Sequence, residues 1–292
     1  MTDRRPVLCA TDFSPISDRA LDVAAALARA LDAPLAIVHA MDTGLGSETA
    51  VTPEIAEASR VLHARVDARV AAARTALDAA ATRVGAPEAD RRIVDGRPAE
   101  AIAAHATAID AWIVVLGTHG ATHGLTHARD VVLGTTADRL VRDTARPVLV
   151  VPSTLPATFS MPAPWVAGVS IDPTAVHALE EGIALSLLTK TPINAVHVVR
   201  SEESDERPAA ARFDELVVDS LARAGIVGDR LTWVVRGDAG AMLAGFAKDL
   251  GAILVIGTHA PGALARLARG STAARVIEHA EVPVLVVPKK KS

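Results

Sequence analysis

Residues 253–288 read ILVIGTHAPGALARLARGSTAARVIEHAEVPVLVVP, and this stretch decides the fold. The apolar run 253–256 is short, rich in β-branched residues and closed by Gly257, which is typical of a buried parallel strand. Gly270-Ser-Thr272 then opens an amphipathic helix, Pro283 ends it, and 284–287 is a second buried strand. A helix start that follows a glycine loop offers backbone N–H groups to an anion such as phosphate.

The same pattern occurs earlier in the chain. The sequence Gly134-Thr-Thr-Ala-Asp-Arg matches the helix start, Pro147-Val-Leu-Val-Val-Pro matches the closing strand, and Gly117-Thr-His matches Gly257-Thr-His. Strands alternate with helices in both halves. The expected strands are 7–11, 35–40, 91–94, 112–116 and 148–151, then 166–171, 193–199, 231–235, 253–256 and 284–287. This alternation predicts an α/β fold of two tandem Rossmann-like domains, each a doubly wound five-stranded parallel sheet flanked by helices.

The segment 152–164 contains four prolines and no periodic pattern, so we expect a linker there. We therefore predict two domains, at 1–152 and 165–292, joined by a linker at 153–164. The two Val-Leu-Val-Val strands would be exposed sheet edges. Pairing between them inside one chain would give an internal pseudo-dimer and cover both edges. A homodimer of such chains stays open as a further arrangement.

Composition excludes several classes of function. A formal charge of −4 gives no basic footprint for nucleic acid, and the scarcity of aromatic residues disfavours stacking on bases. No apolar run approaches membrane-spanning length, and the N-terminus lacks an apolar signal region. We therefore expect a cytoplasmic protein without a membrane partner. Cys9, the only cysteine, lies in the first strand and is expected to be a small core residue.

Polar residues and glycines gather where the expected strands end. Asp12 and Gly117 do so in the first half, and Asp172 and Gly257 in the second. Doubly wound sheets bind ligands beyond the carboxyl ends of their strands, where the strand order reverses. The aspartates are equally well explained as helix caps, and the glycine loops as plain turns. His39 and His197 also lie near strand ends, and we expect them to be hydrogen-bonded structural histidines.

With these residues in view, the chain resembles a tandem universal stress protein, once in each half. Nucleotide-binding members of that family carry an Asp after the first strand and a Gly-x2-Gly-x9-Gly-Ser/Thr loop after the fourth. They also have a Pro-Val-Leu-Val-Val last strand. The stretch Ala10-Thr-Asp-Phe-Ser14 is similar to the family's opening Thr-Asp-Phe-Ser. The resemblance implies a regulatory protein of the stress response that binds ATP, ADP or AMP and acts on a protein partner that the sequence does not identify.

In the second half, the resemblance implies these nucleotide contacts: Asp172, Val198, Gly257, Ala260, Gly270, Ser271 and Thr272. Asp172 would contact the adenine or ribose side, and Val198 would line the adenine pocket. Gly257 would let the backbone approach the phosphates, and the helix start would hold phosphate oxygens. Ala260 stands where the family has glycine. If that position requires a positive φ, alanine costs stability or reshapes the loop.

In the first half, the implied contacts are Asp12, Ala40, Gly117, Gly120, Gly134, Thr135 and Thr136. Ala40 would form the adenine wall. Thirteen residues separate Gly120 from Gly134, four more than in the family pattern, so we expect a distorted or enlarged phosphate cradle. Gly124 stands nine residues before Gly134 and offers a second register for the loop.

Catalytic and metal-binding motifs are not found. His119, His123 and His127 have the spacing of ligands on one helix face, but Gly120 and Gly124 interrupt that helix and no cysteine or carboxylate pair joins them. We therefore predict no metal site. No phosphate-binding P-loop or nucleophile elbow occurs, so we expect no enzyme, with at most slow, adventitious ATP hydrolysis. The alternative function is a nucleotide-free structural or protein-interaction module of the same fold with degenerate sites.

Overall fold

The computed structural model describes residues 5–44, 53–118, 133–171, 176–199, 207–225, 232–258 and 272–289. The first half contains β1 (Val7–Ala10), α1 (Pro15–Ala30), β2 (Leu35–Met41), α2 (Pro53–Arg83), β3 (Asp90–Asp95), α3 (Pro98–Ala108), β4 (Ile113–Gly117), α4 (Thr135–Asp143) and β5 (Val148–Val151). The second half contains β6 (Trp165–Gly168), α5 (Val176–Thr189), β7 (Ile193–Val199), α6 (Arg207–Arg223), β8 (Thr232–Arg236), α7 (Ala239–Asp249), β9 (Ile253–Gly257), α8 (Thr272–His279) and β10 (Val284–Val287). The strand expected at 166–171 ends early, at Gly168, and the other strands lie where the sequence places them.

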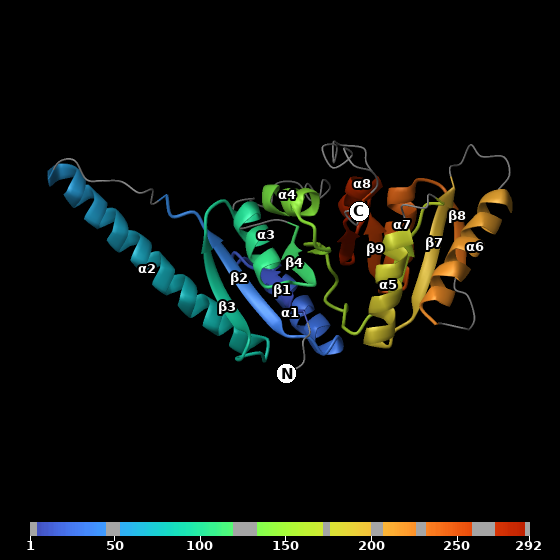
Figure 1. The fold of residues 1–292 in the computed structure, drawn as a ribbon, viewed down its shortest axis with the longest axis horizontal. Coiled ribbons are helices and arrows are strands. Elements are labelled where there is room, and N and C mark those ends of the chain that lie inside the picture. The colour runs from blue at the N-terminus through green and yellow to red at the C-terminus, as the bar shows by residue number, and fades with distance from the viewer. Residues whose placement is uncertain are drawn as a thin grey trace.

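All ten strands form one sheet in the order β3-β2-β1-β4-β5-β10-β9-β6-β7-β8 (Figure 1). Neighbouring strands run parallel within each half. At the centre, β5 and β10 pair antiparallel, with Leu149 opposite Leu285. The predicted doubly wound fold is confirmed, and so is the predicted pairing of the two Val-Leu-Val-Val strands within one chain.

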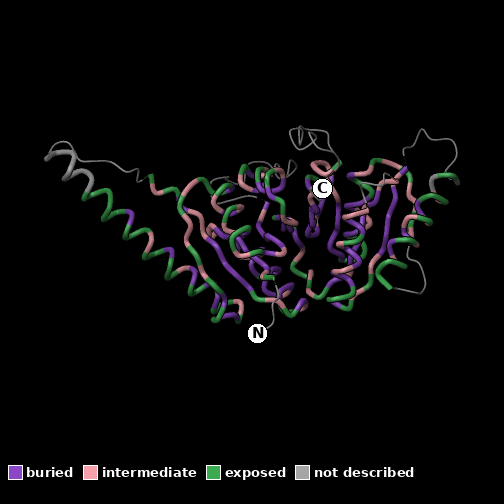
Figure 2. Tube along the Cα trace, in the orientation of Figure 1, coloured by how far each residue is buried: buried purple, intermediate pink, exposed green. Residues whose placement is uncertain are grey.

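Side chains alternate between the two faces of the sheet, as the period of a strand requires. One face is covered by α1, α2, α5 and α6, and the other by α3, α4, α7 and α8. Figure 2 shows the buried strands and the exposed outer sides of the helices. Both large apolar cores contain residues of both halves. The apolar packing therefore does not separate the two halves. The domain boundaries 1–152 and 165–292 stay a prediction.

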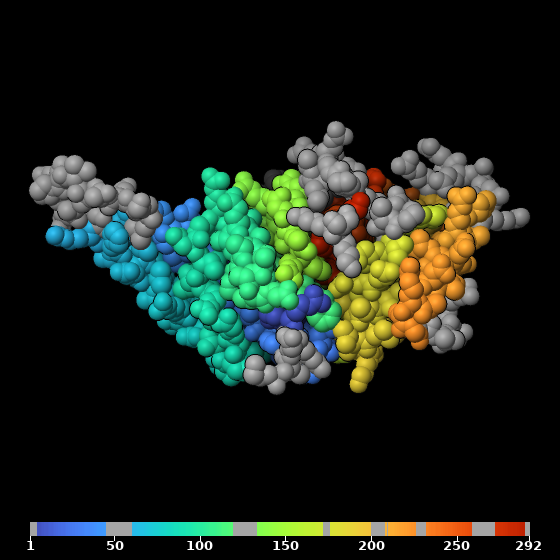
Figure 3. Space-filling model, in the orientation of Figure 1, coloured from blue at the N-terminus to red at the C-terminus, as the bar shows by residue number. Residues whose placement is uncertain are grey.

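The connection between the halves is packed against the protein. Leu155 and Ala163 are buried in the core beneath α1. Arg19 of α1 donates from Nη2 to the carbonyl oxygens of Leu155 at 3.2 Å and Pro156 at 3.1 Å. The segment expected to be a linker is thus anchored by apolar and polar contacts, and the halves abut in the space-filling view (Figure 3).

Cys9 is fully buried in β1, as expected. Burial raises the pKa of its thiol well above the ordinary range, which makes it an inert core residue. None of the helices in the described ranges combines the length and hydropathy that a membrane span requires.

Candidate nucleotide site

Two pairs of neighbouring strands form the points where the strand order reverses. In the first half, the chain leaves β1 toward β2 and later returns to β4 on the other side of β1. Asp12 follows β1 and Gly117 ends β4, so both lie at the carboxyl edge of this switch point. In the second half, β6 and β9 take the same places, and Gly257 ends β9. Ligands of doubly wound sheets bind at this position.

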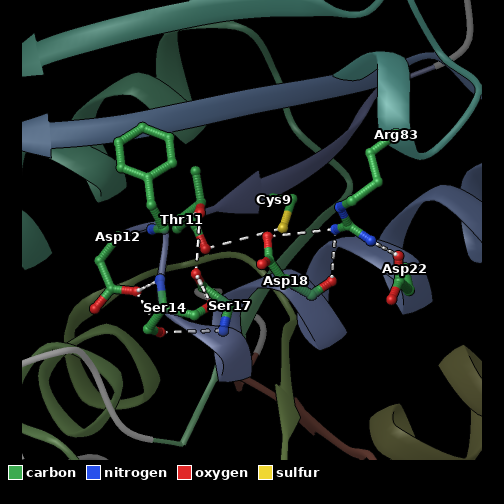
Figure 4. Close-up of polar contacts among 10 residues, drawn as sticks. Cys9, Thr11, Asp12, Ser14, Ser17, Asp18, Asp22 and Arg83 are labelled. Carbon is green, nitrogen blue, oxygen red and sulfur yellow. Dashed lines mark hydrogen bonds and ion pairs between the residues drawn. The ribbon is translucent and has the colours of Figure 1, made fainter. Parts of the chain in front are cut away.

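A compact set of hydrogen bonds holds Asp12 at the start of α1 (Figure 4). Its Oδ1 accepts from the Ser14 backbone N–H at 3.1 Å and from the Ser14 hydroxyl at 2.6 Å. Ser14 is the residue that caps α1, since its Oγ accepts from the Ser17 N–H at 3.3 Å. The structural interpretation of Asp12 therefore takes a corrected form: it supports the cap and is not the cap itself.

The turn after β1 is fixed by two further contacts. Thr11 Oγ1 lies 3.0 Å from Ser17 Oγ and accepts the Phe13 N–H at 3.0 Å (Figure 4). Phe13 has a φ of 63°, in the left-handed region that non-glycine residues rarely adopt. Its ring packs on His39, with 4.6 Å between the ring centroids. Local side-chain contacts thus compensate for an unfavourable backbone conformation next to the switch point.

His39 and His197 occupy corresponding places in the two halves. The Nδ1 atom of His39 lies 2.8 Å from the Thr11 carbonyl oxygen, and that of His197 lies 2.8 Å from the Val169 carbonyl oxygen. Each bond ties the end of one strand to the segment that follows its neighbour. The expectation of hydrogen-bonded structural histidines is confirmed.

Gly117 and Gly257 differ in the space around them. A Cβ atom on Gly117 would overlap the Cγ2 methyl of Ile16, in the first turn of α1. On Gly257 it would stand 3.3 Å from the Cβ of Ala178. The close approach of α1 therefore already requires glycine at position 117, independently of any ligand.

The start of α4 is brought directly to the end of β4. The Gly134 N–H donates to the Thr118 carbonyl oxygen at 2.7 Å, and the Thr118 N–H donates to Val151 at 3.0 Å. Gly134 is the N-cap, with φ −60° and no side-chain cap hydrogen bond. Thr135 is exposed and Thr136 half-buried in the first turn. The first-turn amides of α4 thus stand beside the switch point, and the N-cap residue itself supplies no side chain to cap them.

The described residues of the second half show part of this arrangement at α8. The Thr258 N–H donates to Val287 at 3.1 Å, as Thr118 does to Val151. Thr272 opens α8 and is exposed. The Thr258 hydroxyl is buried and has no hydrogen-bond partner within the described ranges. Arg275 of α8 forms an ion pair with Asp238 at 2.6 Å, which fixes α8 to the start of α7.

Ala40 and Val198, the two expected adenine-wall residues, correspond in position. Ala40 pairs in register with Val94, and Val198 with Val235. Both are half-buried and pack on the core beneath α3, α4, α7 and α8. They therefore lie on the sheet face from which α4 and α8 arise.

Several predicted residues lie outside the described part of the chain: Asp172, Gly120, Ala260, Gly270, Ser271, His119, His123 and His127. Among the residues that are described, no group of three or more His, Cys, Asp or Glu side chains is arranged to hold a metal ion. That the three histidines form no metal site stays a prediction.

Sequence reasoning missed one contact at the same edge. Asp95, which ends β3, accepts hydrogen bonds from the Thr43 N–H at 2.9 Å and the Thr43 hydroxyl at 3.0 Å. These bonds lower the pKa of the Asp95 carboxyl below its ordinary value. The signal was available, because Asp95 comes directly after an expected strand, as Asp12 does.

The comparison with known proteins agrees with the internal repeat of the chain. The model of the universal stress protein family matches residues 3–152 and again 166–288. A search of curated proteins gives no match. A universal stress protein from Archaeoglobus fulgidus superposes with a TM-score of 0.69 at 16% identity, covering 98% of this chain and 98% of that one.

Two Pseudomonas aeruginosa structures match over the same share of this chain, with slightly lower TM-scores. One is a candidate universal stress protein, with a TM-score of 0.64, 17% identity and coverage of 98% of this chain and 94% of that one. The other is a functionally unknown protein, with a TM-score of 0.62, 17% identity and coverage of 98% and 93%. At these identities the likeness concerns the fold alone.

Proposed function

The chain belongs to the universal stress protein family, and on that premise we propose that it is a non-enzymatic regulatory module that binds an adenine nucleotide in the crevice of one or both halves. The ligand is ATP, ADP or AMP. Its phosphates lie at the start of α4 or α8, and its adenosine lies toward Ala40 or Val198. This is the regulatory role in the stress response that the resemblance to the family implies.

The observation that carries the proposal is the bond between Gly134 and Thr118. It brings the first turn of α4, whose N-cap residue Gly134 has no side chain to cap it, to the carboxyl end of β4. β4 pairs with β1, the strand that Asp12 follows. Backbone N–H groups and the positive end of the helix dipole then face the place where ligands of such sheets bind. An anion is the ligand chemistry that this arrangement favours.

The buried Thr258 hydroxyl supports the second half in the same role. A buried hydroxyl without a partner in the described part of the chain costs free energy, and a ligand oxygen or ordered water would satisfy it. Against this stands Ala260, which replaces a family glycine. The first half keeps that glycine as Gly120 but carries the longer loop. Each half therefore departs from the family pattern once.

The regulatory role follows from linkage. A nucleotide that binds one conformation of the protein more tightly shifts the population toward it. A protein partner that prefers the same conformation then binds in response to nucleotide level. No base or metal is placed for phosphoryl transfer in this proposal, so any hydrolysis is slow and incidental.

The test is nucleotide-dependent stabilisation of the full chain, read by thermal unfolding with ATP, ADP, AMP and GTP. At a ligand concentration of a hundred times Kd, one occupied site adds about 2.7 kcal/mol to the free energy of unfolding. We also expect adenine nucleotide in the supernatant of the denatured, freshly purified protein. If no nucleotide shifts the unfolding temperature and none is released, the nucleotide-free interaction module is the correct reading.

Paired variants assign the site to one half. Thr135→Glu places a carboxylate at the start of α4. The carboxylate interacts favourably with the helix dipole but repels phosphate. Thr135→Gln is the neutral control. Thr272→Glu and Thr272→Gln do the same at α8. Loss of the nucleotide shift in only one glutamate variant identifies the half that binds. Retention in both glutamate variants would place the phosphates elsewhere.

A further inference from the structure

The two outer edges of the ten-stranded sheet are protected differently. At one edge, β3 reads DRRIVD, with four charged residues among six. At the other edge, β8 reads TWVVR, with one. Exposed edge strands pair readily with other strands, and charged side chains are a common protection against this. By this criterion β3 is a protected edge and β8 is an open one.

An aromatic side chain lies on the open edge. Trp233 of β8 is 46% exposed, whereas its counterpart position on β3 is held by Arg92. Of the other two tryptophans, Trp165 is fully buried and Trp112 is half-buried and bonded to Glu181 at 2.7 Å. Trp233 is therefore the tryptophan that the surface presents.

Its neighbours hold the Trp233 ring in place. The indole N–H donates to Asn194 Oδ1 at 3.1 Å, and the ring packs on Phe246 with 5.6 Å between centroids. Met242 of the same helix is 36% exposed, and it lies close to Gly237, just beyond the end of β8. A side chain that is already ordered loses little entropy when a partner covers it, so this patch is suited to binding.

We propose that a second copy of this chain pairs with β8, antiparallel and about a twofold axis. The sheet already contains one such junction, because β5 and β10 join the two halves edge to edge in antiparallel fashion. The sequence of β8 is also self-complementary in that arrangement. With Val234 on the axis, Trp233 lies opposite Val235 of the partner subunit, an aromatic and β-branched pair that stabilises sheets.

The charges of β8 are compatible with the same occupant. Arg236, the one charged residue of β8, lies opposite Thr232 of the partner subunit in this register, so no like charges meet. A twofold contact also closes on itself and leaves no open edge for further growth. A contact confined to two five-residue strands is small beside stable interfaces, which typically bury ~1,200–2,000 Å², so we expect a weak dimer.

The test is sedimentation velocity of the full chain over a concentration series that spans the micromolar range. Trp233→Lys restores the type of protection seen on β3, and Leu188→Lys, at a side chain 49% exposed on α5, is the matched control. We expect the natural chain and Leu188→Lys to dimerise alike, and Trp233→Lys to raise Kd by about tenfold or more. A monomer at every concentration, or a dimer that Trp233→Lys leaves intact, would overturn the proposal.

Hydrogen exchange on the natural chain gives a second, variant-free measurement, which decides if Trp233→Lys does not fold. Amides of 232–236 should gain protection as concentration rises, while those of 90–95 should not. Equal protection of 232–236 at low and high concentration would also overturn the proposal. Neither measurement depends on nucleotide, so a failure here is distinct from a failure of the proposed function.

Discussion

Leu149 of β5 and Leu285 of β10 lie opposite each other in the antiparallel pair that joins the two halves. Both are completely buried, and both belong to a core that also contains side chains of α1, α2 and α5. The centre of the sheet therefore lies in the interior of the molecule, in a core that both halves share. The stability of the whole chain should therefore depend on these two side chains.

Truncation at this centre should destabilise the whole chain. Leu149→Ala or Leu285→Ala removes buried methyl groups and leaves a cavity, which costs about 2–5 kcal/mol in the free energy of unfolding. Because the cores are shared, we expect one unfolding transition in urea, observed by circular dichroism. Leu188→Ala, at an exposed site, is the control and should change the free energy by ~0.5 kcal/mol or less. Two separate transitions would show that the halves unfold independently.

Two glycines of α7 should respond oppositely to alanine. A Cβ on Gly240 would stand 2.8 Å from the Arg275 Cβ and 3.1 Å from its backbone carbon, so α8 must shift, at a cost of about 1–3 kcal/mol. A Cβ on Gly245 would meet nothing within 4 Å, so Gly245→Ala should stabilise by about 0.5–1 kcal/mol through helix propensity. Urea denaturation of the two variants checks this. Equal effects would mean that α7 and α8 do not pack this closely.

The stability of the protein should depend on His105 below neutral pH. Burial lowers the pKa of His105 below its ordinary value of about 6.5, with Asp90 opposing and Arg92 adding to the shift. Its Nε2 atom is buried and has no partner in the ranges that are described. The unfolded chain therefore binds the proton first, and the native state loses stability as pH falls through about 6.5 toward the lower folded-state pKa.

A matched variant isolates that contribution. Phe246 occupies the corresponding position in the second half, so His105→Phe uses a residue that this fold accepts there. We expect the variant to lose less stability than the natural chain between about pH 7.5 and pH 5.5, measured by urea midpoints. Identical pH dependence of the two proteins would assign the effect to other histidines.

Substitution of Asp12 separates its structural contacts from its proposed ligand contact. Asp12→Ala removes the acceptor of both Ser14 bonds and should cost about 1–2 kcal/mol without nucleotide. Asp12→Asn keeps an acceptor oxygen and should cost less. If Asp12 also contacts adenosine, Asp12→Asn weakens the nucleotide shift at nearly unchanged stability. Equal stability of the alanine variant and the natural chain would contradict the contacts that hold Ser14.

The repeat in the sequence was sufficient to predict the sheet and its central junction. Alternating apolar runs and glycine turns determine which segments are strands, and two identical Val-Leu-Val-Val segments indicate equivalent edges. Ser14 followed by Pro15 is a local signature of a helix start, and Ser14 is indeed the cap of α1. What stayed out of reach depends on tertiary packing. Nothing in the local pattern shows that Ile16 lies over Gly117, or that Asp12 bonds to Ser14. These contacts are decided by how helices settle on the sheet.

The candidate site was predicted in outline for a similar reason. Strand ends meet at one edge in any parallel sheet, so Asp12, Gly117 and Gly134 were expected to converge. The hydrogen bond that brings the start of α4 to Thr118 joins two backbone atoms, so no side chain in the sequence announces it. The position of Asp95 at a strand end was visible in the sequence, but its bond to Thr43 was not, because Thr43 follows a different strand.

The antiparallel seam between β5 and β10 has a genetic consequence. In a homodimer, one gene specifies both sides of the axis, so every substitution is inherited twice and the two sides must remain alike. Here each side has its own codons, and the sides are free to diverge. The two halves do differ at equivalent positions, with Arg92 on β3 and Trp233 on β8. One molecule therefore has one outer strand rich in charge and one that is not.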